Sequence, residues 1–116
     1  MRVLVTGGRN YSDADRVAAV LDKLHSAHGI DVIIQGGAGG ADGLARLWGW
    51  SRVGVKVTTF EADWENQGRF AGPARNQRMI DEGKPDVVIA FPGGRGTADM
   101  CRKARKAGFE VVEISP

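Results

Sequence analysis

Three glycine-rich segments follow short apolar runs, and their composition is suited to holding a phosphate group. They are Gly-Gly-Arg at 7–9, Gly-Gly-Ala-Gly-Gly at 36–40 and Pro-Gly-Gly-Arg-Gly-Thr at 92–97. Because glycine has no Cβ, consecutive backbone N–H groups can turn toward an anion without steric cost. The third segment leads into a predicted helix, whose first N–H groups and dipole also favour negative charge. We therefore expect a phosphate-bearing ligand at these segments, although each one alone also fits a simple turn.

Polar residues in or near these segments are candidates to contact the same ligand. The guanidinium group of Arg75 matches phosphate geometry, or it pairs with Asp81 or Glu82 in solvent. Asn76 either fixes a base or a ribose hydroxyl or only holds a loop. Asp42 either caps the second helix or contacts the ligand through a ribose hydroxyl or a metal. The complete predicted ligand-binding set is Gly7, Gly8, Arg9, Gly36, Gly37, Gly40, Asp42, Arg75, Asn76, Gly93, Gly94, Arg95, Gly96 and Thr97.

A polar stretch between 61 and 72 contains Trp64 between two acids, Asp63 and Glu65. Such a stretch could form a lid in which the indole ring stacks on a base. The alternative is that Trp64 fills the edge of the core. The sequence leaves both interpretations open.

Standard motifs for cofactors and metals are missing. The first two glycine segments lack the spacing G-x-G-x-x-G, and G-x-x-x-x-G-K-[ST] does not occur, which argues against a dehydrogenase and a P-loop NTPase. His25 and His28 lie three residues apart, but no cluster of carboxylates or cysteines completes a metal site. We predict no cofactor and no metal.

The composition is that of an ordinary globular domain apart from its glycine content. Of 116 residues, 42% are hydrophobic and 26% are charged. The 17 glycines are roughly twice the usual share. A net charge of +2 does not demand a nucleic-acid partner. Cys101 is the only cysteine and no apolar run is long enough to cross a membrane, so we expect a cytoplasmic protein without membrane contact.

Alternating apolar and amphipathic stretches predict the elements that position these residues. The expected strands are 2–6, 31–34, 56–60, 86–90 and 109–114, and the expected helices are 13–27, 41–51, 73–83 and 97–107. Strands that are apolar throughout and followed by helices indicate a parallel sheet covered on both faces. Right-handed crossovers then predict an α/β, Rossmann-like doubly wound sheet of order 3-2-1-4-5. In that order the first and fourth strands are neighbours at the switch point where such sheets bind ligands.

Five segments, in their order along the chain, resemble those of the SLOG superfamily and, within it, the YspA (cpYpsA-related) family. They are VLVTGGR at 3–9, GGAGGADGLA at 36–45, ADW at 62–64, GPARN at 72–76 and PGGRGT at 92–97. The resemblance covers nearly the whole chain. It implies a single Rossmann-like domain over 1–116 that binds nucleotides or nucleotide-derived signals.

The chain is also distantly similar to LOG-type phosphoribohydrolases, which cleave the N-glycosidic bond of nucleoside 5′-monophosphates. Their signatures are P-G-G-x-G-T-x-x-E and R-K-x-x-M, and this chain matches the first half of the former. Arg75 and Met79 match the ends of the second signature, while Asn76 replaces its lysine. Met100 stands in the place of the signature glutamate, with Asp99 beside it. The resemblance implies Asp99 and Arg75 as catalytic candidates, and the departure at Met100 argues against the relatives' mechanism.

Three functions remain open. The preferred one is a nucleotide-binding protein, either a sensor or a subunit. The second is a phosphoribohydrolase or related N-glycosidase, a hydrolase. The third is a single-stranded nucleic-acid module, because the superfamily includes a DNA-processing protein and the chain has a basic cluster, Arg102, Lys103, Arg105 and Lys106.

One predicted helix is apolar around much of its circumference, which indicates either deep burial or a subunit contact. Its large apolar residues are Leu44, Leu47, Trp48 and Trp50. Since the related enzymes are commonly dimers, we expect a homo-oligomer.

Overall fold

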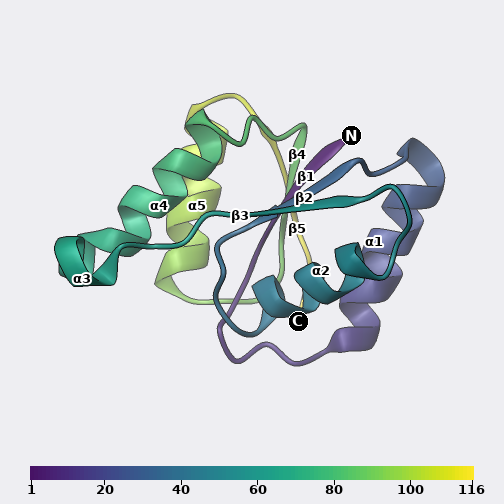
Figure 1. Ribbon diagram of the computed structural model, residues 1–116, viewed down its shortest axis with the longest axis horizontal. Coiled ribbons are helices and arrows are strands. Elements are labelled where there is room, and N and C mark those ends of the chain that lie inside the picture. The colour runs from purple at the N-terminus through teal and green to yellow at the C-terminus, as the bar shows by residue number, and fades with distance from the viewer.

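Five parallel strands form one sheet at the centre of the computed structural model, which describes residues 1–116 (Figure 1). The strands are β1 (Arg2–Thr6), β2 (Val32–Gln35), β3 (Lys56–Thr59), β4 (Val87–Ala90) and β5 (Glu110–Glu113). Their order is β3-β2-β1-β4-β5, and every neighbouring pair is parallel. The predicted α/β Rossmann-like fold and its strand order are therefore confirmed.

The helices cover both faces of the sheet. They are α1 (Ala14–His28), α2 (Ala41–Trp50), α3 (Trp64–Gln67), α4 (Ala71–Asp81) and α5 (Arg95–Lys106), with a 3₁₀ turn, η1, at Gly68–Phe70. In Figure 1, α1 and α2 lie on one side of the strands and α4 and α5 lie on the other. None of these helices is long and apolar enough to cross a membrane.

Two apolar clusters separate the layers. One joins β1, β2 and β4 to α1 and α2 and includes Val17, Leu21 and Trp48. The other lies under α4 and α5 and includes Met79 and Met100. Because the three central strands face both clusters, every residue of β2 and β4 is buried. This burial on both sides explains why those strands are apolar in the sequence, apart from Gln35 at the end of β2.

Element boundaries differ from the predictions mainly around the site. The stretch expected as a loop forms α3 and η1, and α4 begins at Ala71, two residues before Pro73. Pro73 still lies in the first turn, where its missing N–H removes no helical hydrogen bond. Helix α5 begins at Arg95 and not at Thr97, because the chain enters the helix at Gly94, whose carbonyl accepts from the Ala98 N–H at 3.0 Å.

Candidate ligand-binding site

The three glycine-rich loops meet at the carboxyl edge of the sheet and pack directly on one another. The Gly8 N–H donates to the Pro92 carbonyl at 2.9 Å, and the Gly8 carbonyl accepts from the Ala41 N–H at 3.2 Å. Gly40 crosses so close that a Cβ there would lie 2.1 Å from the Gly8 oxygen, and its φ of +63° also favours glycine. Part of the glycine content therefore serves contact between loops and not contact with a ligand.

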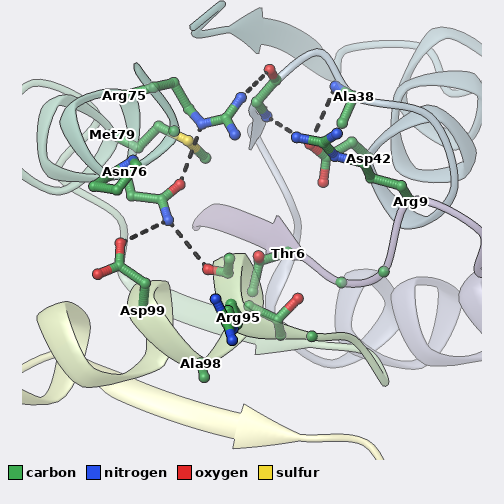
Figure 2. Close-up of a pocket in the computed structure, with 18 of the residues that line it drawn as sticks. Thr6, Arg9, Ala38, Asp42, Arg75, Asn76, Met79, Arg95, Ala98 and Asp99 are labelled. Atoms are coloured by element: carbon green, nitrogen blue, oxygen red, sulfur yellow. Dashed lines mark hydrogen bonds between the residues drawn. The ribbon is translucent and has the colours of Figure 1, made fainter. Parts of the chain in front are cut away.

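A cavity of about 820 Å³ opens beside these loops, between the β1 end of the sheet and helices α4 and α5 (Figure 2). The predicted residues that line it are Gly7, Gly8, Arg9, Gly36, Asp42, Arg75, Asn76, Gly94, Arg95, Gly96, Thr97 and Asp99. Gly37 lines an adjoining, smaller cavity, whereas Gly40 and Gly93 line neither of the two. The structure thus brings most of the predicted set to one place.

Three backbone donors of the second glycine loop are used within the protein. The Asp42 carboxylate accepts from the N–H groups of Gly36 at 3.1 Å and Ala38 at 3.3 Å. The Gln35 side-chain oxygen accepts from the Gly37 N–H at 2.7 Å. An internal carboxylate thus occupies the place where an external anion was expected. Burial raises the pKa of Asp42, and these hydrogen bonds together with the charge of Arg75 offset only part of that rise.

The prediction that Asp42 caps α2 is wrong. The N-cap residue of α2 is Gly40, and no side chain accepts a hydrogen bond from the first turn. Asp42 lies inside that turn, and its side chain turns back to the loop before the helix. A short-range sequence pattern cannot distinguish a cap from this backward contact, because both place an aspartate next to a helix start.

The N-terminus of α5 keeps its donors free. Its N-cap, Gly94, has no side chain, and the N–H groups of Arg95, Gly96 and Thr97 donate to no protein acceptor. All four residues line the cavity. Since a helix begins with unpaired N–H groups and the positive end of its dipole, this wall of the cavity attracts an anion.

Arg75 and Asn76 on α4 connect the cavity walls. The Arg75 Nη1 donates to the Gly36 carbonyl and its Nε donates to the Asn76 side-chain oxygen at 3.2 Å. The Asn76 Nδ2 donates to the Gly96 carbonyl at 3.1 Å and to Asp99 at 3.0 Å (Figure 2). The alternative that Arg75 pairs with Asp81 or Glu82 is wrong. The bond to Gly96 agrees with the alternative that Asn76 holds a loop, since Gly96 belongs to the glycine segment 92–97.

The carboxylate of Asp99 lines the cavity but is held by several partners. Arg102 and Lys103 form ion pairs with it, and Asn76 donates to it. Burial works to raise the pKa of Asp99, but these hydrogen bonds and positive charges together lower it below its ordinary value. Met100, in the place of the relatives' glutamate, is fully buried in the core beneath α5 and does not line the cavity.

The charge of the cavity is strongly positive. Five arginines and two aspartates line it. Arg69 and Arg102 were not predicted to face the ligand. No sequence signal marks Arg69, whereas Arg102 was noted only as part of the basic cluster between 102 and 106. The basic cluster on α5 is largely paired, because Asp99 binds Arg102 and Lys103 and Glu113 binds Arg105.

Trp64 does not fill the edge of the core, so that alternative is wrong. Its side chain is 50% exposed, lines the cavity and lies under the guanidinium of Arg9, whose Cζ is 5.4 Å from the ring centroid. This cation–π contact joins the β1 loop to α3 across the cavity. The segment 61–72 therefore contributes a wall of the site through Trp64, Arg69 and Gly72.

Comparison with known proteins agrees with this architecture. The family model described as "YspA, cpYpsA-related SLOG family" matches residues 1–67, more than half of the chain. The chain is also similar to "Gene 61 protein" of Mycobacterium phage D29, with 44% identity over 121 residues that cover 97% of this chain and 95% of the phage protein. The chain therefore belongs to the YspA, cpYpsA-related SLOG family.

Proposed function

We propose that the whole chain forms one domain that binds a nucleotide or nucleotide-derived ligand, with its phosphate at the N-terminus of α5. Membership of the SLOG family suggests nucleotide-related ligand binding. The observation that carries the proposal is the set of free N–H groups of Arg95, Gly96 and Thr97, which face a large cavity. The Thr97 hydroxyl can donate to the same phosphate oxygens.

The charge of the cavity supports an anionic ligand. Both aspartates that line it already have partners: Asp42 accepts from two N–H groups and Asp99 pairs with two cations. The guanidiniums of Arg9, Arg69 and Arg95 have no carboxylate within salt-bridge distance. Guanidiniums grouped around one space repel each other, and an anion between them removes that cost.

Calorimetric titration with AMP and GMP, beside adenosine and guanosine, tests the proposal. We expect the nucleotides to bind at least tenfold more tightly than the nucleosides, since a charge-assisted hydrogen bond contributes about 1.5–3 kcal/mol. Arg95→Ala should weaken nucleotide binding roughly tenfold. Arg105→Ala, on the same helix but outside the cavity, is the matched control. The proposal fails if nucleotides and nucleosides bind equally or if neither binds at millimolar concentration.

A second candidate, hydrolysis of the N-glycosidic bond, is favoured by one observation: the Asp99 carboxylate lines the same cavity. Its lowered pKa keeps it ionised at neutral pH, which suits stabilisation of a ribosyl cation and not donation of a proton. Chromatography of AMP incubated with the protein should then show adenine and ribose 5-phosphate. Turnover that survives both Asp99→Asn and Arg75→Ala would contradict these roles.

We also propose that α2 mediates self-association. Leu47 and Trp50 are 61% and 67% exposed, and Val53 beyond the helix is fully exposed, although Trp48 is buried. Adjacent large apolar side chains on a surface are typical of a protein contact. Light scattering should show a dimer that Leu47→Ser with Trp50→Ser converts to a monomer. A wild-type protein that is monomeric at high concentration would exclude this contact.

A further inference from the structure

A second cavity of about 370 Å³ adjoins the first one. Arg9, Gly36, Trp64 and Arg75 are among the residues that line both cavities. The two spaces thus share a border formed by the Arg9–Trp64 pair and by Arg75. A ligand with its phosphate in the larger cavity can extend past this border into the smaller one, which Gly37, Glu61 and Ala62 complete.

The walls of the second cavity suit a flat ring. Gly37 has a φ of +78°, and a Cβ on it would lie 3.0 Å from the Thr59 methyl group and 3.3 Å from the Glu61 Cγ. Gly36, Gly37 and Gly39 line the cavity without side chains, so bare backbone forms part of its surface. Trp64 supplies an aromatic side chain that is half exposed to solvent. Base–aromatic stacking is tolerant of base identity, so a hydrogen-bonding group must provide any selectivity.

Glu61 is that group. It supplies the one carboxylate that lines the second cavity. Its carboxylate makes no ion pair, and only its backbone carbonyl accepts a hydrogen bond, from Arg78 at 3.3 Å. The Glu61 carboxylate repels phosphate at its end of the second cavity, whereas the free N–H groups of α5 attract phosphate in the larger cavity and the guanidiniums of Arg9 and Arg75 attract it at the border. These opposite charges orient a nucleotide with its base toward Glu61.

Carboxylates discriminate among bases by the pattern of donors that they meet. Guanine presents two adjacent donors, N1–H and the N2 amino group, which match the two oxygens of a carboxylate. Adenine and cytosine place a ring acceptor beside their amino group, and that acceptor repels a carboxylate oxygen. Inosine retains N1–H but lacks the N2 amino group. Glu61 is the only side chain of the second cavity that accepts hydrogen bonds, because those of Arg9, Arg75 and Trp64 only donate. A base that offers two adjacent donors, as guanine does, is therefore favoured there.

We propose that the second cavity is a nucleobase site in which Glu61 selects guanine. The inference rests on the proposed function, because it requires a nucleotide whose phosphate lies at α5. To the proposed function it adds where the base binds, which base is preferred and which residue is responsible for that preference. Glu61 is a specificity residue and takes no part in holding the phosphate.

Calorimetric titration with GMP, IMP and AMP tests the site in the full-length protein. We expect GMP to bind roughly tenfold more tightly than AMP, with IMP between them, because a good bidentate contact discriminates by about that factor. Glu61→Gln should weaken GMP binding and abolish or reverse the preference over AMP, because the glutamine amide offers one donor and one acceptor, which match adenine better than guanine. Glu65→Gln, an exposed acid outside both cavities, should change neither. Because the Glu61 carboxylate has no partner, its replacement should not alter the thermal midpoint of the free protein.

The outcomes separate this inference from the proposed function. Equal affinities for GMP and AMP, or a GMP preference that survives Glu61→Gln, would overturn the inference while nucleotide binding stands. A protein that binds none of the three nucleotides would overturn both. The wild-type comparison of GMP with IMP decides the question even if the variant folds poorly.

Discussion

Asn76 and Asp99 join helices α4 and α5 at the wall of the cavity, with the Asn76 Nδ2 3.0 Å from an Asp99 carboxylate oxygen. The same Asn76 amide also donates to the Gly96 carbonyl in the first turn of α5 and accepts from Arg75. One side chain thus fixes the position of the proposed phosphate site relative to α4. The contacts of Asn76, Asp99, Trp64 and Gly7 each lead to one prediction.

Asn76→Ala should destabilise the fold by about 2 kcal/mol, because the residue is only 6% exposed and its loss removes three partly buried hydrogen bonds. Urea unfolding followed by circular dichroism measures the change. Gln77→Ala is the control, since Gln77 is exposed and bonds only Asp81, so its effect should stay within about 0.5 kcal/mol. Equal effects of the two substitutions would show that the link between α4 and α5 contributes nothing.

The pH dependence of stability should include a contribution from Asp99. Its folded-state pKa is lowered, so the ionised carboxylate stabilises the native state above the ordinary carboxyl range. That contribution is lost as the pH falls through the folded-state pKa. Asp99→Asn should therefore be less stable than wild type at pH 6, and the two should converge in acid, as urea unfolding from pH 6 to pH 3 would show. A constant difference across this range would contradict the lowered pKa.

Trp64→Ala should weaken nucleotide binding roughly tenfold, since stacking of a base on an aromatic ring is worth about 1–3 kcal/mol. The substitution also removes the partner of the Arg9 guanidinium. Trp50→Ala is a matched control, because Trp50 is exposed on α2 and lies outside both cavities. Calorimetry should show unchanged affinity for the control. Unchanged affinity for Trp64→Ala would exclude stacking on this ring.

Gly7→Ala should destabilise the fold by about 1–3 kcal/mol through overpacking. A Cβ at this position would lie 2.5 Å from the Ala41 Cβ and 3.0 Å from the Phe91 Cβ, both of which are buried. Gly96→Ala serves as the control, because a Cβ there meets no atom within 4 Å and alanine favours a helix. Urea unfolding should show loss of stability for Gly7→Ala alone. Equal stability of the two variants would mean that β1 and α2 can separate at little cost.

The sequence alone was enough to predict the fold. Runs such as 32–34 and 87–90 are apolar throughout because both of their faces are buried, and that property is visible without coordinates. The right-handedness of the crossovers then leaves few possible strand orders, and the predicted order 3-2-1-4-5 is confirmed. The meeting of the three glycine loops follows from the same argument, since parallel strands end at one edge.

Which of those loops can bind an anion was decided only by the tertiary structure. Asp42 and Gln35 accept from the N–H groups of 36–38 in the second loop, whereas no protein group accepts from those of 95–97. The local sequence pattern likewise does not show that Trp64 faces the cavity. It also does not show that Arg69 and Arg102 line the cavity. The physical reason is that the type of a residue, such as glycine, aspartate or arginine, determines only which hydrogen bonds it can donate or accept. Only the folded chain determines whether another part of the protein already makes those hydrogen bonds.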